Sequence, residues 1–510
     1  MDFSPTPTPL LRSDDPLAVL LRQRAALVLI ETHEEGAVIA RLQELLREFL
    51  RPLFSWSITR GLRRLDLVEQ ADRPPEFAAS SNDVLDAMQR ARERSVYVLF
   101  EFDTFLGYAV NQRKFRELVL RHDCPDHTII LVSPKFDLPA SIDALSVRAP
   151  MPVPTQAQLL DMIKLEASAF SKEQGGKRVQ LILSSVNTMV SMLHGMPMAD
   201  ARRIAQRVIA NDGCINDADL PEIAKAKFEL IDKSGVLSFE PEQVSLDDIA
   251  GLDNLKRWIQ IRRPVFMGEN TAGLDPPRGV LLLGVQGCGK SMAAKAVAAG
   301  FRVPLLRLDM GSIYDKFHGE SERKLRESLD QAARMAPCVL WLDEIEKGMS
   351  QGGSDDAVSR RVLGYFLTWL NERKAPVFVV ATANQIDMLP PELLRKGRFD
   401  EIFFVDLPRA SARRRAFAIH LARRKLDAVD FDLDLLAQNS AGFSGAEIEQ
   451  AIASARFSAH ADGAPIETAT ILRELKLTRP LSVVMAEPIA ALRAWAKTRT
   501  VSADADEFIA

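Results

Sequence analysis

The chain has 510 residues, and at about 150 residues per domain this length corresponds to roughly three folding units. Its 65 Lys and Arg residues against 69 Asp and Glu residues give a formal net charge of −4, and 47% hydrophobic with 26% charged residues is typical of soluble globular proteins. These values exclude a disordered chain and a nucleic-acid binder that works by bulk charge.

The sequence also argues against membrane insertion and secretion. Its apolar runs are far shorter than the roughly 18 residues that span a bilayer, and residues 1–15 lack the basic and apolar regions of a signal peptide. The four cysteines, Cys124, Cys214, Cys288 and Cys338, are too widely spaced for a zinc knuckle or a disulfide framework. We therefore expect a reduced, cytoplasmic protein.

The first half of the chain predicts an α/β lobe. Alternating Thr and Pro make residues 1–13 a loose arm, and residues 14–150 then contain apolar strands at 26–30, 96–103 and 128–134, separated by helical or polar segments. This alternation indicates a parallel sheet covered by helices. Residues 151–236 carry amphipathic helical patterns and are predicted to be a helical appendage.

The second half repeats the scheme. Ser234 to Asp248 combine Gly, Pro and acidic residues without apolar periodicity, which predicts a linker. An α/β subdomain over 237–407 then has apolar strands at 279–283, 338–342 and 376–381, and residues 408–510 are predicted to form a helical lid with a C-terminal helix. The matching order of strands in both halves indicates an old duplication.

The clearest motif is a phosphate-binding loop. Gly284 to Ser291 fit the pattern G-x-x-x-x-G-K-[ST] between a strand and a helix. The glycines let backbone N–H groups surround phosphate oxygens, and the helix adds the positive end of its dipole. Lys290 is expected to reach the β- and γ-phosphates, and the Ser291 hydroxyl to ligate Mg²⁺.

Two carboxylates follow the next apolar strand, at the sheet edge where ligands bind. Asp343 is expected to hold Mg²⁺ through water, and Glu344 to polarise the attacking water as a general base. Asn384 ends the third strand and could orient the same water. Arg395 and Arg398 lie three positions apart on an exposed turn, where guanidinium groups suit a transferring phosphate.

These motifs resemble those of AAA ATPases of the AAA+ superfamily over residues 244 to about 501. The segments that carry the resemblance are LDDIAGLD, GVQGCGKS, KFHGESERKLRE, VLWLDEIEKG, ATANQIDMLPPELLRKGRFDEIF and AGFSGAEIEQAI. The resemblance implies ATP and Mg²⁺ as cofactors and a homo-oligomeric ring, usually a hexamer. It also implies that Arg395 and Arg398 act in trans on a neighbouring subunit's nucleotide.

The resemblance further implies which residues surround the nucleotide and which face the pore. The expected nucleotide contacts are Ile249, Ala250, Gly251, Gly284, Gln286, Gly287, Cys288, Gly289, Lys290, Ser291, Met292, His420, Gly445 and Ala446. Ala446 stands where many AAA+ relatives carry a sensor arginine. Phe317 lies in a segment similar to the family's central-pore loop and is expected to grip a substrate chain, and residues 348–353 are a candidate second pore loop or a plain connection.

The arrangement of the whole chain resembles AAA proteins of cyanobacteria, which also occur in plastid genomes as a hypothetical chloroplast reading frame. In the first lobe the place of the phosphate loop is taken by Ile30 to Gly36, which has no Lys and three carboxylates. We expect this degenerate lobe not to bind ATP and to serve as a scaffold or recruitment module. No H-E-x-x-H motif occurs in the chain, which excludes a zinc protease of that type.

The sequence thus predicts a ring-forming Mg²⁺-ATPase that remodels or translocates a macromolecule, with a protein partner or adaptor bound through residues 14–236. An ATP-controlled assembly switch and a nucleic-acid-stimulated motor remain open as alternatives. Nucleic acid is not favoured, because the basic runs at 413–415 and 423–425 have no interleaved aromatic residues.

Overall fold

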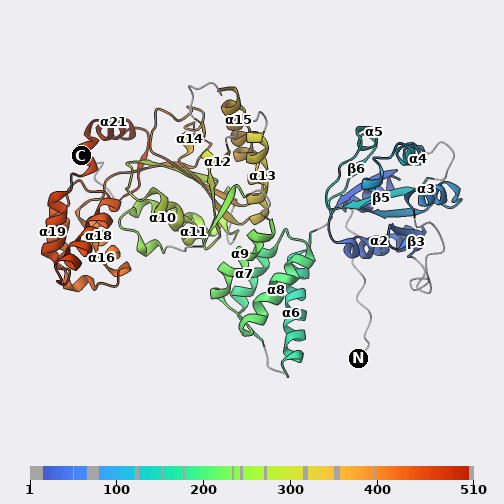
Figure 1. Ribbon diagram of the computed structural model, residues 1–510, viewed down its shortest axis with the longest axis horizontal. Coiled ribbons are helices and arrows are strands. Elements are labelled where there is room, and N and C mark those ends of the chain that lie inside the picture. Colours follow the sequence, from blue (N-terminus) through green and yellow to red (C-terminus); the bar gives the residue numbers. More distant parts are fainter. Residues whose placement is uncertain are drawn as a thin grey trace. The chain divides into compact units, whose positions relative to one another are not determined.

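The computed structural model divides the chain into two compact units. The described residues are 15–49, 51–65, 80–120, 126–151, 153–175, 179–231, 235–241, 245–268, 273–313, 320–349, 356–395 and 397–504. The N-terminal unit comprises residues 1–155 with 197–199, and the C-terminal unit comprises 156–196 with 200–510 (Figure 1).

The N-terminal unit is built on one six-stranded sheet with the order β3-β2-β4-β5-β1-β6. All neighbouring strands are parallel except the edge strand β3, which runs antiparallel to β2. The strands are β1 (Leu27–Glu31), β2 (Leu53–Ser57), β3 (Gly61–Arg64), β4 (Val96–Phe100), β5 (Thr128–Ser133) and β6 (Val147–Arg148).

Helices cover both faces of this sheet, because β1, β4 and β5 are apolar on both sides. One core joins α1 and α2 to one face, and a second joins α3, α4 and α5 to the other. The helices are α1 (Pro16–Arg22), α2 (Glu35–Phe49), α3 (Ser81–Arg90), α4 (Ala109–Leu120) and α5 (Ala140–Asp143).

The C-terminal unit begins with a helical bundle, which covers most of the residues predicted as a helical appendage of the first lobe. Apolar residues on α7 and α9 and on the neighbouring helices form its buried interior. The elements of the bundle are α6 (Gln156–Glu173), β7 (Gln180–Leu181), α7 (Leu183–Leu193), α8 (Met198–Asp212), β8 (Cys214–Ile215) and α9 (Leu220–Ile231).

A seven-stranded sheet with the order β15-β14-β10-β13-β12-β11-β9 forms the centre of this unit. Every neighbouring pair is parallel except β9 with β11. The strands are β9 (Leu237–Glu240), β10 (Gly279–Gly284), β11 (Leu305–Asp309), β12 (Cys338–Asp343), β13 (Val377–Ala383), β14 (Glu401–Val405) and β15 (Val501–Ser502).

Two apolar cores fix helices to the two faces of this sheet. Helices α10 and α11 pack on one face, and α12, α13, α14 and α15 pack on the other (Figure 1). These helices are α10 (Asp253–Phe266), α11 (Lys290–Phe301), α12 (Met310–Ile313), α13 (Glu320–Met335), α14 (Ile345–Met349) and α15 (Asp356–Glu372).

A separate apolar core holds together four helices that we call the lid, α16 to α19. They are α16 (Ala410–Arg423), α17 (Leu433–Asn439), α18 (Gly445–Ala461) and α19 (Thr468–Leu477). After the lid, α20 (Leu481–Val484) and α21 (Ala486–Ala496) lead the chain back to the sheet, where β15 pairs with β14.

The α/β class and the parallel sheets are confirmed, but the structure corrects the predicted linker. Within residues 234–248, Leu237–Glu240 form the edge strand β9 with Leu237 buried, so these four residues are part of the sheet. An edge strand has a single neighbour and can be short, which leaves little periodicity in the sequence. The apolar pattern also did not predict the strands β11, β14 and β15 of the C-terminal sheet or β2, β3 and β6 of the N-terminal sheet.

Five parallel strands are arranged alike in the two sheets. The order β6-β1-β5-β4-β2 of the first corresponds to β14-β10-β13-β12-β11 of the second, in space and along the chain. Each series ends in an antiparallel edge strand, but β3 follows β2 in the chain whereas β9 precedes β10. The five-stranded part of the first lobe is thus AAA-like at the level of its backbone. No helix among the described residues is long and apolar enough to cross a membrane.

Candidate nucleotide site

The loop between β10 and α11 forms a concave turn of backbone at the carboxyl edge of the sheet. Gly287 and Gly289 have φ angles of 77° and 92°, a region that side chains disfavour. At Gly284, an added Cβ would lie 2.0 Å from the carbonyl oxygen of Val405, so the close packing of β10 on β14 requires glycine. The free N–H groups at the start of α11 add the positive end of its dipole.

Lys290 is buried beneath this loop. Its Nζ donates hydrogen bonds to the carbonyl oxygens of Gly284 at 2.8 Å and Val285 at 2.9 Å. Burial lowers the pKa of Lys290 to about 8, although the nearby carboxylates of Glu346, Glu344 and Asp343 act to raise it. The ammonium group thus lies next to the loop whose backbone would surround a phosphate.

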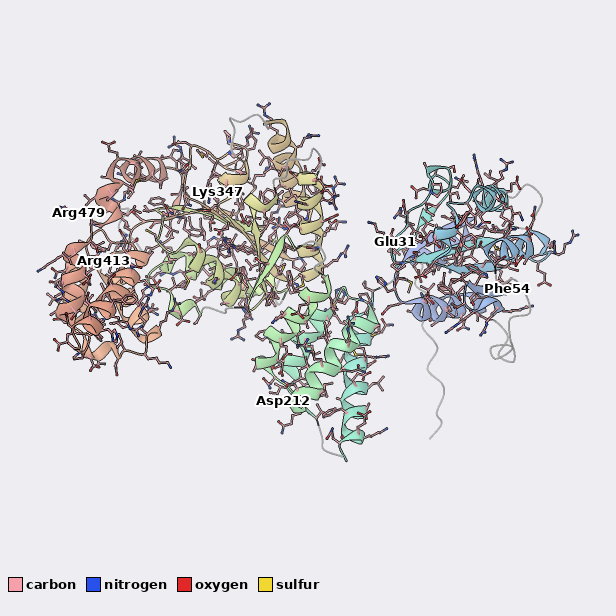
Figure 2. All side chains as sticks on the ribbon, viewed as in Figure 1. Glu31, Phe54, Asp212, Lys347, Arg413 and Arg479 are labelled. Atoms are coloured by element: carbon pink, nitrogen blue, oxygen red, sulfur yellow. The ribbon has the colours of Figure 1, made fainter. Side chains whose placement is uncertain are left out.

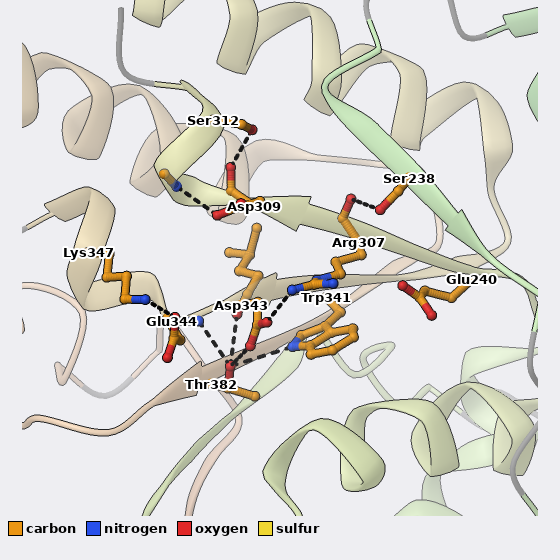
Figure 3. Close-up of polar contacts among 12 residues, drawn as sticks. Ser238, Glu240, Arg307, Asp309, Ser312, Trp341, Asp343, Glu344, Lys347 and Thr382 are labelled. Atoms are coloured by element: carbon orange, nitrogen blue, oxygen red, sulfur yellow. Dashed lines mark hydrogen bonds and ion pairs between the residues drawn. The ribbon is translucent and has the colours of Figure 1, made fainter. Parts of the chain in front are cut away.

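The two strand-end carboxylates have different partners. The Asp343 carboxylate accepts a hydrogen bond from the Thr382 hydroxyl at 2.9 Å, through Oδ1, and one from Arg307 at 2.8 Å, through Oδ2 (Figure 3). Glu344 has a left-handed backbone with φ of 49°, and its N–H donates to the Thr382 hydroxyl at 3.1 Å. Because of this turn, the side chains of Asp343 and Glu344 point in different directions.

Glu344 is held by an amide and a cation. Its Oε1 accepts a hydrogen bond from Asn384 Nδ2 at 3.1 Å, and its Oε2 forms an ion pair with Lys347 on α14 (Figure 3). The Asn384 N–H donates in turn to Glu346 Oε1 at 2.8 Å. Side chains at the ends of β12 and β13 therefore contact each other directly, while the role of Asn384 in orienting water stays a prediction.

A cavity of about 450 Å³ joins these groups to the lid. Its volume falls within the range of roughly 300–1,000 Å³ that is typical of small-molecule sites. It is lined by Asp248, Ile249, Ala250, Gln286, Gly287, Cys288, Gly289, Lys290, Ser291, Met292, Asp343, Glu344, Thr382, Asn384, Pro408, Ala416, Ile419, His420, Arg423, Gly445, Ala446 and Glu449.

The lid contacts the phosphate loop directly. The Ala446 N–H donates to the Gly287 carbonyl at 3.2 Å, and α18 begins with a capping box in which Ser444 and Glu447 cap one another. Across the cavity, His420 Nδ1 lies 3.9 Å from Glu449 Oε2, and burial lowers the pKa of His420 below its usual value. The cavity therefore has a loop end with Lys290, Asp343 and Glu344, and a lid end where apolar residues lie beside His420, Arg423 and Glu449.

Comparisons with known proteins agree with this geometry. The profile of the "ATPase family associated with various cellular activities (AAA)" matches residues 280–407. The "uncharacterized AAA domain-containing protein ycf46" of Pyropia yezoensis is 35% identical over 494 residues, which cover 94% of this chain and 96% of that protein. The chain belongs to the AAA ATPase family. Its counterpart in Guillardia theta is 34% identical, with 94% of each chain covered.

Residues ahead of the AAA domain also match this family. The profiles "SpoVK-like AAA ATPase, N-terminal domain" and "SpoVK-like AAA ATPase, second domain" match residues 13–150 and 157–234. The "ATPase family gene 2 protein" of Schizosaccharomyces pombe is 31% identical over 310 residues, which cover 58% of this chain and 38% of that protein. The similarity to the relatives from Pyropia yezoensis and Guillardia theta thus extends beyond the AAA domain and covers 94% of this AAA ATPase chain.

Most of the predicted nucleotide contacts in this AAA ATPase line the cavity, but four predicted site residues do not. Gly251 packs close to Asp504 and Ala412, and Gly284 packs against the backbone of Val405. Arg395 is exposed, and the half-buried Arg398 donates to the Leu367 carbonyl at 3.1 Å. Phe317 and most of the candidate second pore loop, residues 350–353, lie outside the described residues.

Sequence reasoning missed several residues of this AAA ATPase site. Thr382 connects Asp343 and Glu344, Arg307 pairs with Asp343, and Glu449 faces His420 from the lid. Thr382 and Arg307 could be found only from the register of the strands, which the sequence does not display. Burial raises the pKa of the Cys288 thiol to about 12, which opposes the thiolate that an oxidation switch would need.

The residues present fit a nucleotide with a divalent cation. The positive φ angles of Gly287 and Gly289 open the loop, Lys290 supplies a buried cation, and Ser291 and Asp343 supply oxygen donors at the same cavity. Oxygen atoms are the ligands that Mg²⁺ prefers. AAA ATPases generally use ATP with Mg²⁺, and this cavity has groups for both.

Proposed function

We propose that the protein binds and hydrolyses ATP with Mg²⁺ in the cavity between β10, β12, β13 and the lid. The observation that supports this most directly is the pair formed by Glu344 and Asn384 at 3.1 Å, in the same cavity as Lys290 and Ser291. A carboxylate that polarises water must be ionised and correctly aimed. Here one oxygen of Glu344 is paired with Lys347, and the amide of Asn384 fixes the direction of the other.

Each group has one role in this proposal. Lys290 and the loop N–H groups bind the phosphates, Ser291 and Asp343 hold Mg²⁺, which neutralises charge on the phosphate oxygens, and Glu344 accepts the proton of the attacking water. Ile249, Ala250 and His420 border the remaining part of the cavity, where the base and sugar would lie.

The test is the variant Glu344→Gln, which keeps the hydrogen-bonding shape but cannot accept the proton. We expect ATP binding within about threefold of wild type and a loss of turnover of at least about a hundredfold. Nucleotide affinity is measured by calorimetry and turnover by phosphate release. Normal turnover in Glu344→Gln would show that another group activates the water.

We further propose that Arg395 and Arg398 serve the site of an adjoining subunit in a ring, with six subunits as the expected number. The cavity lining includes Arg423 but neither of these two arginines, and Arg395 is exposed. Mixing Arg398→Ala subunits with wild type should lower turnover more steeply than dilution alone. A strictly linear loss would show that each subunit works independently.

The proposed work is the remodelling of a protein partner, recruited through residues 14–236. The free cysteines among the described residues, Cys214, Cys288 and Cys338, support a reducing compartment, for which we propose the cytoplasm.

The partner is tested by capture: the Glu344→Gln protein with ATP should retain protein partners that wild type releases. Loss of this capture in Phe317→Ala with ATPase retained would support threading, whereas unchanged capture would favour an assembly switch. Stimulation of the ATPase by polynucleotide with a steep salt dependence would favour the nucleic-acid motor.

A further inference from the structure

Asp343, the carboxylate proposed to hold Mg²⁺, already has both oxygens occupied within the protein. Oδ1 accepts from the Thr382 hydroxyl at 2.9 Å, and Oδ2 accepts from the Arg307 guanidinium at 2.8 Å. The side chain of Asp343 is 16% exposed and that of Arg307 is 38% exposed, so bulk water only partly screens this pair.

The register of the sheet sets this contact. In the parallel pair of β11 and β12, Arg307 lies beside Trp341 and Asp309 lies beside Asp343. Because side chains alternate along a strand, Arg307, Trp341 and Asp343 project from the face of the sheet that α10 and α11 cover. The Arg307 side chain therefore extends past Trp341, its direct neighbour, and contacts Asp343, the next residue on the same face of β12 (Figure 3).

Four side chains form a closed circuit around this contact. The Arg307 guanidinium lies 4.9 Å from the centre of the Trp341 ring, and Trp341 Nε1 donates to the Thr382 hydroxyl at 3.5 Å. The same hydroxyl donates to Asp343, which accepts from Arg307. Ring stacking and ion pairing together hold the guanidinium in one orientation.

We propose that Arg307 is the resident counter-ion of Asp343, which aims this carboxylate and prevents it from binding a divalent cation until a nucleotide is present. Guanidinium stays charged at all accessible pH values, so the positive partner of the pair is permanent. Its positive charge opposes a second cation at Asp343, and the phosphates of a nucleotide supply the negative charge that offsets it.

Arg307 is a positioning residue in this proposal, because it does not line the cavity and acts through Asp343. The proposal rests on the proposed function for the role of Asp343. The two can fail separately, however, because metal binding in the absence of nucleotide does not depend on ATP hydrolysis.

The test measures binding of Mn²⁺, as a probe for Mg²⁺, to the full-length protein without nucleotide by electron paramagnetic resonance. Arg307→Gln should bind one Mn²⁺ at least tenfold more tightly than wild type, and Arg307→Lys should behave like wild type because it keeps the charge. The double variant Arg307→Gln with Asp343→Asn should lose this gain. An unchanged affinity in Arg307→Gln, or a gain that survives Asp343→Asn, would overturn the proposal.

A matched control and a milder variant complete the design. Arg326 forms the same two kinds of contact elsewhere, an ion pair with Glu322 at 3.3 Å and a stacking contact 4.9 Å from the Tyr365 ring centre, so Arg326→Gln should leave Mn²⁺ binding unchanged. Asp343→Asn alone should alter nucleotide-free Mn²⁺ affinity less than twofold, since Arg307 already occupies that carboxylate. A tenfold loss in this variant would contradict the proposal even if Arg307→Gln did not fold.

Discussion

The two sheets share the order of five parallel strands but differ at the edge where ligands bind. In the C-terminal sheet, residues 285–289 form an open loop between β10 and α11, whereas in the N-terminal sheet only residues 32–34 separate β1 from α2. Glu31, labelled in Figure 2, ends β1. It forms an ion pair with Arg148 at 2.7 Å. The shorter connection has no room for the turn of backbone that surrounds a phosphate.

The middle strands show how far the likeness extends. Glu101 follows β4 with φ of 50°, as Glu344 follows β12 with φ of 49°, so both strands end in a left-handed glutamate. The residue before it is the buried Phe100 in one case and Asp343 in the other. The backbone turn is thus common to both sheets, while the side chains for metal and phosphate are present in one.

The largest expected effect comes from removing the buried lysine of the phosphate loop. Lys290→Ala should weaken ATP binding by at least about a hundredfold, because a desolvated cation beside the phosphates is lost and the dipole of α11 remains alone. His33→Ala, in the connection that replaces this loop in the N-terminal sheet, should leave ATP affinity unchanged. Calorimetry with ATP and Mg²⁺ measures both. If His33→Ala also reduced binding, the first lobe would contribute to a nucleotide site.

The pair of left-handed glutamates gives the second comparison. Glu101→Gln should leave turnover within about twofold of wild type, in contrast to the loss expected for Glu344→Gln. The reason is that Glu101 lacks neighbours that correspond to Asp343 and Lys290. Steady-state phosphate release at saturating ATP is the measurement. A loss in Glu101→Gln comparable with that in Glu344→Gln would mean that both strand ends take part in hydrolysis.

These comparisons also show what the sequence could and could not predict. The phosphate loop and the acidic pair depend on local chain order, so the motif from Gly284 to Ser291 and the doublet Asp343-Glu344 were identified directly. The positions of Thr382 and Arg307 depend on which strands are neighbours and in what register, which is a property of the assembled sheet. The short strands β9 and β15 were missed because an edge strand needs few apolar residues.

The two units also differ in buried lysines: the described residues of the N-terminal unit include none, whereas the C-terminal unit buries Lys227. Lys227 on α9 is 1% exposed and donates hydrogen bonds to the carbonyl oxygens of Met192 and His194. Burial lowers its pKa to about 8, whereas a lysine in an unfolded chain titrates near about 10.4. Between these values the folded protein binds fewer protons than the unfolded chain, so its free energy of unfolding rises with pH.

The cost of burying the charged Lys227 is fully present below pH 8 and is relieved as the pH rises toward about 10.4. The stability of wild type relative to Lys227→Met should therefore increase by about 1–3 kcal/mol between pH 7 and pH 10. Calorimetric unfolding of both proteins at several pH values measures this difference. Lys225→Met, on the exposed side of the same helix, should show no such trend. A difference for Lys227→Met that stays constant with pH would contradict the assigned pKa.

The smallest expected effect concerns β15, the edge strand that lies beyond β14 in the C-terminal sheet. The Asn254 side chain donates hydrogen bonds to the carbonyl oxygens of Ser502 at 3.2 Å and Asp504 at 2.7 Å. The backbone N–H of Asn254 donates to the carbonyl oxygen of Ala503 at 3.1 Å. Residues 502–504 thereby fasten the first turn of α10 and, through it, the segment that precedes α10. That segment includes Ile249 and Ala250, which line the cavity.

Asn254→Ala removes two side-chain hydrogen bonds of about 1 kcal/mol each, and part of this energy should appear as a three- to tenfold weaker affinity for ATP. Asn439→Ala is the matched control, because its side chain donates to the Leu435 carbonyl at 2.8 Å within the lid and does not line the cavity. Both variants are compared by calorimetry at one temperature. If Asn254→Ala lowered thermal stability but bound ATP like wild type, β15 would stabilise the sheet without shaping the nucleotide site, and the two sheets would differ functionally only in the loop and side chains at their carboxyl edges.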